Sequence, residues 1–547
     1  MKTILILMIL IVSSLKSNSQ VTQEWEARYN GPSNSIDRGG SIVYDNSGNV
    51  FVTGSSNGNG SEYDFVTIKY NPSGIQEWIA TYNGPGNSDD YGSAIVLDNS
   101  GNVYVTGSSF GVGSNLDYAT IKYNSDGVLQ WVARYNGIHN SADYSYLLSI
   151  DNAGNVYVSG HEGIIDSSDF CTIKYNTNGE MQWVSRYNGP GNFYNQTTSL
   201  VLDDLGNAYV TGSTTGIGTG FYDYVTIKYN SVTGNQEWVA SYNGPGPGNN
   251  FDEAFSSTID ESGNIYVTGS SNDNNSQGSC ATIKYNSNGV QQWVARYRGT
   301  NNSYAFGYAI KSDAAGNVYV TGYSFNNVTD YDYLTIKYNS SGDELWAVNY
   351  NGTANGTDIA DVIAVDNFDN IYVSGRSKGT GSDDDYLTIK YDSSGNELWT
   401  KRYNGPGNGN DRPTSLKIDD NGNLYLTGYS LGSGSSTDYD YATIKYSQSV
   451  GINQISTIIP EKFSISQNYP NPFNPTTKIK FDLKNSSLVK IVVFDMIGKE
   501  VATLVNENLS AGSYESNFDG SKLTSGIYFY RIETENYSEV KKMTLLK

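Results

Sequence analysis

Apolar residues in this chain fall in short runs separated by Gly, Asn, Asp and Ser. Within residues 93–135 four such runs follow one another: SAIVLD, VYVTGSS, DYATIKY and VLQWVARY, here called A, B, C and D. No long stretch places apolar residues three and four positions apart, so the pattern predicts strands and very little helix. The connections NSGN between A and B and NSDG between C and D are typical of β-hairpins. The sequence therefore predicts four-stranded antiparallel meanders.

This four-strand unit repeats along most of the chain. The eight tryptophans recur every 52 to 55 residues, and the tetrapeptide TIKY also occurs eight times. A period near 50 residues is typical of propellers and repeat arrays. Because run A shows no polar alternation, each sheet should be covered on both faces, as a propeller blade is by its neighbours.

The two ends of the array predict that it closes into a ring. It begins with a lone D run, QEWEARYNG at 23–31, and ends with a lone C run, DYATIKY at 440–446. The first D run can pair with the last C run, whereas a linear solenoid would be expected to carry distinct polar caps. The predicted fold is all-β: an eight-bladed β-propeller of four-stranded blades over 21–446, whose N-terminal strand closes the last blade. A solenoid or another blade count is the alternative.

Residues shared by the repeats are expected to serve packing. We expect the tryptophan of run D to fill space between blades. The Asp before TIKY, absent only in the fifth unit, is expected to organise the loop that leads into run C; it is present as Asp64, Asp117, Asp169, Asp223, Asp332, Asp385 and Asp440. Cys171 and Cys280 occupy different places in non-adjacent units, so we expect two small buried hydrophobic residues and no disulfide.

The two ends of the chain differ from the repeats. Residues 1–20 contain Lys2, the apolar run ILILMILIV and then small and polar residues, the layout of a secretory signal peptide. Nine apolar residues are too few to span a bilayer, which needs about 20, and no later segment is suitable, so no transmembrane segment is expected. Residues 447–462 are interpreted as a linker. The strand-like runs of 463–547 predict a small Ig-like β-sandwich.

The net charge of −22 makes nucleic acid an improbable partner, because so acidic a surface repels phosphate backbones. Closing the ring removes the need for a partner strand, so a monomeric ring is expected.

Residues that break the repeat are candidates for chemistry, because a catalytic centre needs its groups only once. The chain has two histidines: His139 in a D–A connection and His161 in the following B–C loop. With Asp143 and Glu162 they form a candidate metal site, since imidazole and carboxylate are suitable ligands. The alternative is two exposed loop histidines. Asp383–Asp385 is either an ion-binding segment or a solvated run of charge.

Other signatures of chemistry are weak or absent. DNSGN turns superficially resemble calcium loops but lack the alternating acidic positions of an EF-hand. The sequence contains no P-loop, HExxH or CxxC motif. No catalytic, cofactor-binding or metal-ligating residue is therefore assigned, no cofactor is expected, and an enzyme is not expected.

The loops indicate a working face. The A–B and C–D turns are nearly uniform, whereas the D–A and B–C loops vary in length and are rich in Gly, Asn, Ser, Asp and Tyr. Binding residues tend to lie in variable loops on a rigid frame, and Tyr and Asn suit a glycan or a polypeptide ligand. The alternative is drift in loops that have no task.

Two resemblances accompany these patterns. The pattern D-x-x-G-N-x-Y-V-T-G followed by TIKY, recurring through 22–446, resembles the bacterial β-propeller repeat (SBBP) family and, more distantly, NHL-type repeats. That family is nominally seven-bladed, whereas eight units are present here. The resemblance implies a binding scaffold and no particular reaction.

NYPNPFNPTTKIKF, FDMIGKEV, LSAGSYESNFDGSKLTSGIYFYRI and KKMTLLK follow in order within 463–547. They resemble the C-terminal sorting domain of the type IX secretion system of Bacteroidetes-type bacteria. The resemblance implies recognition by that machinery and export across the outer membrane, with release or attachment at the cell surface. An Ig-like stalk or adhesion module is the alternative.

Together these inferences favour a secreted or cell-surface binding or scaffold module. The alternatives are an extracellular carbohydrate-active hydrolase or lyase that uses loop carboxylates, and a purely structural component of the cell surface.

Overall fold

The computed structural model describes residues 21–547 except 59–61, 165–166, 192, 217–220, 246–250, 273–277, 300–301, 368, 434–437, 449–451, 457 and 522. The predicted signal peptide at 1–20 lies outside the described residues. Gln23–Tyr446 and Ser447–Lys547 belong to separate compact units.

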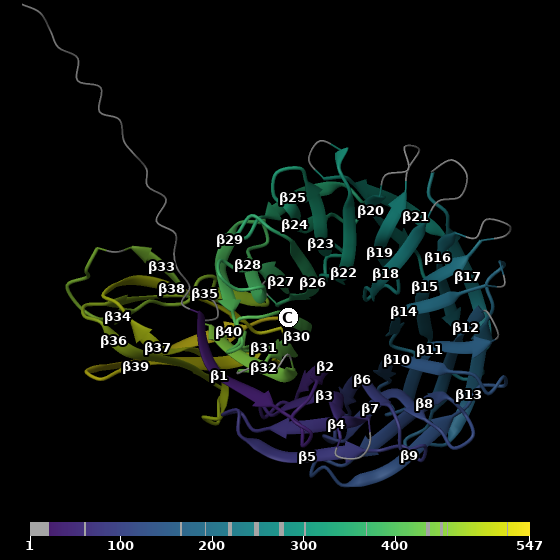
Figure 1. Cartoon of the computed structure of the whole chain (residues 1–547). Helices are drawn as coiled ribbons and strands as arrows, with labels where there is room; N and C mark the ends of the chain where they lie inside the picture. Colours follow the sequence, from purple (N-terminus) through teal and green to yellow (C-terminus); the bar gives the residue numbers. More distant parts are fainter. Residues whose placement is uncertain are drawn as a thin grey trace, which may run out of the picture. The chain divides into compact units, whose positions relative to one another are not determined.

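The first unit is a closed ring of eight four-stranded antiparallel sheets within the described residues (Figure 1). Blades 1 to 4 comprise β2 (Asp37–Tyr44), β3 (Val50–Asn57), β4 (Tyr63–Tyr70), β5 (Gln76–Tyr82); β6 (Asp90–Leu97), β7 (Val103–Phe110), β8 (Leu116–Tyr123), β9 (Leu129–Tyr135); β10 (Asp143–Ile150), β11 (Val156–Ile164), β12 (Ser167–Tyr175), β13 (Met181–Tyr187); and β14 (Asn195–Leu202), β15 (Ala208–Thr215), β16 (Tyr222–Tyr229), β17 (Gln236–Tyr242). Blades 5 to 8 comprise β18 (Asp252–Ile259), β19 (Ile265–Asn272), β20 (Gly278–Tyr285), β21 (Gln291–Tyr297); β22 (Ala305–Ser312), β23 (Val318–Asn326), β24 (Asp330–Tyr338), β25 (Glu344–Tyr350); β26 (Asp358–Val365), β27 (Ile371–Lys378), β28 (Asp384–Tyr391), β29 (Glu397–Tyr403); and β30 (Asp411–Ile418), β31 (Leu424–Leu431), β32 (Tyr439–Gln448), β1 (Val21–Tyr29).

The strand order confirms the predicted closure. In blade 8 the sheet order is β1-β32-β31-β30, so the first strand of the chain is the outermost strand of the last blade. The A strands form the inner ring, where each contacts the A strands of both neighbouring blades, including β2 with β30 (Figure 1). The ring has eight blades and thus departs from the nominal seven of the family that the repeats resemble.

The core of each blade lies in its B and C strands. In blade 2, Val103, Val105, Ala119 and Ile121 are fully buried between the neighbouring sheets. The two-sided burial predicted from run A is thus found in strands B and C, whereas in the AIVL run of strand A only Ile95 is buried. Cys171 and Cys280 also lie fully buried in C strands as free thiols, as predicted.

The tryptophans join consecutive blades, as predicted. The indole N–H of Trp78, in strand D of blade 1, donates to the carbonyl of Ser125 in the C–D turn of blade 2 at 3.1 Å. Gly127 of that turn has φ +79°, and a Cβ there would lie 2.7 Å from the Trp78 ring. The indole therefore rests on a turn that only glycine suits. We call this contact the tryptophan clasp; it recurs at Trp25, Trp78, Trp131, Trp183, Trp238, Trp293 and Trp346.

The short turns have a structural explanation in their aspartates. In the A–B turn of blade 2, Oδ1 of Asp98 accepts from the backbone N–H of Ser100 and of Asn102 at 2.9 Å. Its Oδ2 accepts from the Asn102 side-chain amide and from the Tyr104 hydroxyl. Both carboxylate oxygens are thus engaged in holding the hairpin.

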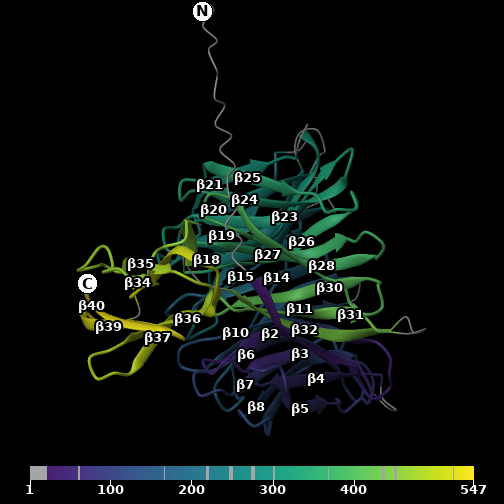
Figure 2. The ribbon, with the colours of Figure 1, turned by 90° about the vertical axis from the view of Figure 1, so that its left-hand side faces the viewer.

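The second unit is a sandwich of two four-stranded sheets, shown in yellow-green in Figure 2, with orders β33-β38-β35-β34 and β37-β36-β39-β40. Its core includes the fully buried Ile479, Ile491, Tyr530 and Ile532. The strands are β33 (Ile452–Ser456), β34 (Ser464–Ile465), β35 (Thr476–Leu483), β36 (Ser487–Phe494), β37 (Glu500–Leu509), β38 (Gly512–Asp519), β39 (Gly526–Thr534) and β40 (Tyr537–Leu545).

The interpretation of 447–462 as a linker is wrong for part of that segment. Ile452–Ser456 forms β33, which pairs with β38, and Ile452 is buried in the sandwich core. The sequence of this short run predicts a strand only weakly. It forms a strand because it pairs with the edge of β38, which would otherwise be open.

Replacing Trp78 by Ala should lower the free energy of unfolding by about 2–3 kcal/mol, because a large ring and an interblade hydrogen bond are lost. Gly127→Ala should also destabilise the protein, but less in the Trp78→Ala background, where no indole meets the new Cβ. Urea unfolding of both single variants and the double variant measures this coupling. Gln76→Ala, at an exposed position of the same strand, is the matched control. Strictly additive losses would contradict the clasp.

Candidate functional site

The D–A and B–C loops lie together at one end of the propeller, as predicted. Gly86 in a D–A loop donates its backbone N–H to the carbonyl of Phe110, where the B–C loop begins, at 3.1 Å. In the next unit the Asn140 side chain donates to the carbonyl of Gly113 at 2.9 Å. Variable segments from two parts of each repeat therefore form one surface, here called the loop face.

Buried carboxylates support the loop face from beneath. In six blades strand A begins with an aspartate that accepts from the N–H of the glycine in the preceding Tyr-Asn-Gly segment; Asp37 accepts from Gly31 at 2.6 Å. Burial raises the pKa of Asp37, and likewise that of Asp143, to about 6. Blade 4 has Asn195 at this position and blade 6 has Ala305. A fixed negative charge is thus dispensable here, which indicates a structural role.

The Asp that precedes TIKY organises the loop leading into strand C, as expected. In blade 2, Asp117 pairs with Arg134 of strand D at 2.9 Å and accepts from Ser114. The same ion pair joins Asp385 to Arg402 and Asp440 to Arg28.

The candidate metal ligands of blade 3 do not converge. His161 packs its ring against Tyr144 and Tyr146, at centroid distances of 5.0 and 5.5 Å. Burial lowers its pKa to about 4. Glu162, the next residue, lies on the opposite face of the strand and pairs with Arg186 at 2.7 Å.

The other two candidates are also separate. Asp143 accepts from Gly137 and Gly163 backbone N–H groups, and His139 lies in the D–A loop, where it acts electrostatically on Asp169. Within the described residues no three His, Cys, Asp or Glu side chains are grouped so that they could hold a metal ion.

The Asp383–Asp385 segment is divided among cationic partners. Asp383 pairs with Lys378 at 2.8 Å, and Asp385 pairs with Arg402. Burial raises the pKa of Asp384, and the charges of Arg376 and Lys378 oppose that rise. The three carboxylates are thus not directed at a shared ion.

The sequence analysis did not identify one group of residues that depart from the repeat, because it considered only histidines and acidic runs. The residue after the Gly of strand B is Ser in blades 1, 2, 4 and 5, but Tyr323, Arg376 and Tyr429 in blades 6, 7 and 8. Aligning YVTGSS with YVTGYS, YVSGRS and YLTGYS would have exposed it. These positions are directly paired with the second residue of strand A, as Arg412 is with Tyr429.

These substitutions create a continuous group of side chains. We call Arg38, Tyr323, Arg376, Arg412, Tyr429 and Tyr439 the arginine–tyrosine cluster. Arg38 of blade 1 lies over the rings of Tyr429 and Tyr439 of blade 8, at 5.4 and 5.9 Å from their centroids. Arg376 is near enough for its charge to act on Tyr323.

Arg412 is held by an acid from the neighbouring blade. Its guanidinium donates to both carboxylate oxygens of Asp361, at 2.7 and 3.3 Å. Burial raises the pKa of Asp361, and the charge and hydrogen bonds of Arg412 offset part of that rise. The pair fixes Arg412 with 38% of its side chain still exposed.

Tyr323 belongs to an aromatic group in blade 6. Its ring is stacked on Phe306 at 4.9 Å and meets Tyr308 and Tyr331 edge-on at 5.4 and 4.9 Å. All four rings are partly exposed, so the cluster combines guanidinium groups with flat apolar surfaces at the loop end of the inner strands.

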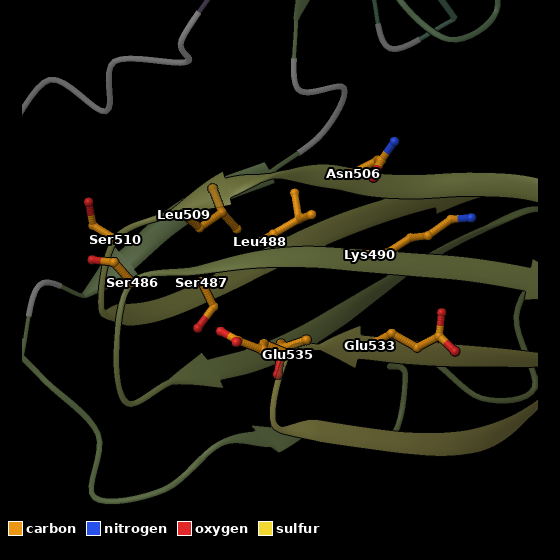
Figure 3. A pocket seen from close by; sticks show the side chains of 10 residues that line it. Ser486, Ser487, Leu488, Lys490, Asn506, Leu509, Ser510, Glu533 and Glu535 are labelled. Atoms are coloured by element: carbon orange, nitrogen blue, oxygen red, sulfur yellow. The ribbon is translucent and has the colours of Figure 1, made fainter.

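The second unit has a depression of about 670 Å³ on the sheet that contains β36 and β39 (Figure 3). Leu488 and Leu509 lie side by side there, and Lys490 and Glu533 extend from neighbouring strands. The lining is thus mixed, with no concentration of one charge.

Comparison with family models assigns both units. The model of the secretion system C-terminal sorting domain matches residues 467–545, and the beta-propeller repeat model matches 24–60, 77–111 and 182–218. Both resemblances drawn from the sequence are thereby confirmed. The protein is a β-propeller that carries a C-terminal sorting domain, and that domain points to secretion or the cell surface. Among the described residues no helix is long and apolar enough to cross a membrane.

An uncharacterized WD repeat-containing protein, L264, of Acanthamoeba polyphaga mimivirus is 26% identical over 381 residues, covering 56% of this chain but only 25% of its own length. Solved structures of similar shape include the WD40 domain of SCAP from fission yeast (9% identity, TM-score 0.40, covering 78% of this chain and 97% of its own). Polysaccharide lyase Uly1 is another (11%, 0.41, covering 74% and 89%). Similarities this low transfer no activity.

Asp37→Asn should change how stability depends on pH. Asp37 keeps its proton to about pH 6 in the folded chain but only to about pH 4 when unfolded, so wild-type stability should fall between pH 4 and 6. The shift of Asp37 corresponds to about 3 kcal/mol at most, and the fall in the variant should be smaller by that amount, because Asp143 still contributes. Urea unfolding at pH 3.5 and 7.5 measures the difference.

Asp98→Asn is the control of opposite sign. Burial acts to raise the pKa of Asp98, but hydrogen bonds from Asn102 and Tyr104 outweigh burial and lower it. The stability that Asp98 contributes should therefore appear as the pH rises. Parallel pH profiles for wild type and Asp37→Asn would contradict the prediction.

Proposed function

We propose that this chain is an exported propeller that binds or scaffolds an extracellular ligand through its loop face. The observation that carries the proposal is the combination in one chain of a sorting-domain match at 467–545 with a rigid ring whose departures from the repeat gather at its loop end. A rigid frame with variable loops is the usual setting of a binding site. The type IX secretion machinery would deliver the protein to the cell surface or release it.

The state of the acidic residues favours binding over catalysis. A glycosidase needs two convergent carboxylates, one of which is able to donate a proton. Asp117, Asp385, Asp440 and Glu162, at the loop end, are each committed to an arginine. A hydrolase or lyase would have to use other acidic residues, so it is the weaker proposal. A purely structural role is also weaker, because it requires no partly exposed arginine–tyrosine cluster.

Export should depend on the second unit. In a bacterium that has a type IX secretion system, the full chain should reach the surface or the medium, whereas a chain that ends after Tyr446 should remain in the periplasm. Immunoblots of cell fractions measure this. Secretion of the truncated chain would contradict the assignment.

A reporter protein fused to 447–547 should also be exported more efficiently than one fused to 463–547. Only the longer fusion keeps β33, which covers the edge of β38. Equal export and equal protease resistance of the two fusions would show that β33 is dispensable.

Binding is tested on an array of neutral and acidic glycans and of extracellular proteins, probed with the full mature chain with and without calcium. A reproducible ligand supports the proposal, and calcium dependence would bring the loop carboxylates back as ion ligands. A blank array would contradict it and favour the structural role.

A further inference from the structure

The repeat provides an internal reference for what the scaffold needs. Four blades place Ser after the Gly of strand B, so the fold does not require a large side chain there. Blades 6, 7 and 8 instead place Tyr323, Arg376 and Tyr429 there, and blades 8 and 1 add Arg412 and Arg38 from strand A. These blades are consecutive around the ring, as β22, β26, β30 and β2 in Figure 1 show. Apart from His161 in blade 3, the exceptions in strand B therefore lie in three adjacent blades, next to Arg412 and Arg38.

Two arginines of this surface have unused hydrogen-bonding capacity. Within the part of the chain that the structure describes, the side chain of Arg38 makes no hydrogen bond or ion pair, and its guanidinium lies over the rings of Tyr429 and Tyr439. Nε of Arg376 is buried and has no hydrogen-bond partner among the described residues. Elsewhere at the loop end, Arg134, Arg186 and Arg402 are each paired with a carboxylate. Arg38 and Arg376 thus keep unpaired donors in a chain of net charge −22, although the charge of Arg376 also acts on Asp361 and Asp384.

A guanidinium with free donors selects planar anions, because its fork matches the two oxygens of a carboxylate. The tyrosine rings beside it offer flat apolar faces, on which the C–H face of a sugar ring can pack while hydroxyls bond at the edges. A surface that spans four blades suits several linked units rather than one small molecule. Carboxylates spaced along a chain of sugar rings meet all three conditions.

We propose that the arginine–tyrosine cluster binds an acidic polysaccharide, with uronate carboxylates held by Arg38 and Arg376 and sugar rings packed on Tyr323, Tyr429 and Tyr439. Arg412, fixed by Asp361, positions the Tyr429 side of the surface. The inference rests on the proposed function and names its ligand class.

The test is isothermal titration of the full mature chain with oligogalacturonate and with alginate oligosaccharides. Their carboxyl-reduced neutral forms, a sulfated glucan and polyglutamate are compared. At least one uronate oligosaccharide should bind, its reduced form should bind at least tenfold more weakly, and the affinity should fall as salt rises.

Arg38→Gln and Arg376→Gln should each weaken uronate binding about tenfold, and Arg376→Lys should not restore it, because an ammonium lacks the planar fork. Arg38 is exposed, so its variant keeps the test valid if Arg376→Gln fails to fold. Tyr222→Ala is the matched control: Tyr222 packs on Phe251 at the loop end of blades 4 and 5, across the ring from Arg38 and Tyr429. Its affinity should be unchanged.

The outcomes separate this inference from the proposed function. Neutral glycans or proteins as the only ligands would overturn the inference and leave the binding role intact. So would uronate binding that Arg38→Gln and Arg376→Gln do not alter. Tighter binding of the sulfated glucan or of polyglutamate would replace the uronate by that ligand. No binding here together with a blank array would remove both.

Discussion

The tryptophan clasp is the contact on which the ring depends. A blade of this protein is apolar on both faces and cannot bury either of them alone. The indole of one blade covers the C–D turn of the next, and the glycine of that turn must lack a Cβ for the ring to lie there. Trp25 makes the same contact from β1 of blade 8 to Pro72 of blade 1, so the clasp also closes the ring. Each unit therefore repeats the same few residues because each has the same neighbour to meet.

Closure leaves the loop end as the part of the propeller where side chains are free to differ. Most of its acidic residues are nonetheless occupied. Asp37 and its equivalents hold the D–A loops, and Asp117 and its equivalents hold the B–C loops through strand D arginines. What remains for recognition is the row formed by the start of strand A and the end of strand B. There different blades carry Ser, His, Tyr or Arg on the same backbone, which makes this row suitable for specifying a ligand.

The fold followed closely from the sequence because the same signals were repeated eight times. The period of the tryptophans, the TIKY segments and the unpaired D and C runs at the two ends were sufficient for the blade count and for the pairing of β1 with β32. Errors arose where a segment takes its structure from a partner. Ile452–Ser456 is a strand because β38 has an open edge. His161 and Glu162 looked like shared ligands, but adjacent strand residues point to opposite faces, toward Tyr144 and Arg186 respectively.

By itself the sequence determined the all-β class, the eight-bladed ring and the sorting domain, because hairpin turns and burial on both faces impose local residue patterns. Only the tertiary structure decided which polar side chains are paired with each other and which keep unpaired donors. Arg134 and Arg38 are the same residue type, yet one is paired with Asp117 and the other lies over two tyrosines from the other end of the repeat array. The arginine–tyrosine cluster joins residues 38 and 439, which are neighbours only because the ring closes. The order of the runs predicts that the ring closes, but no local pattern records which side chains from its two ends then meet.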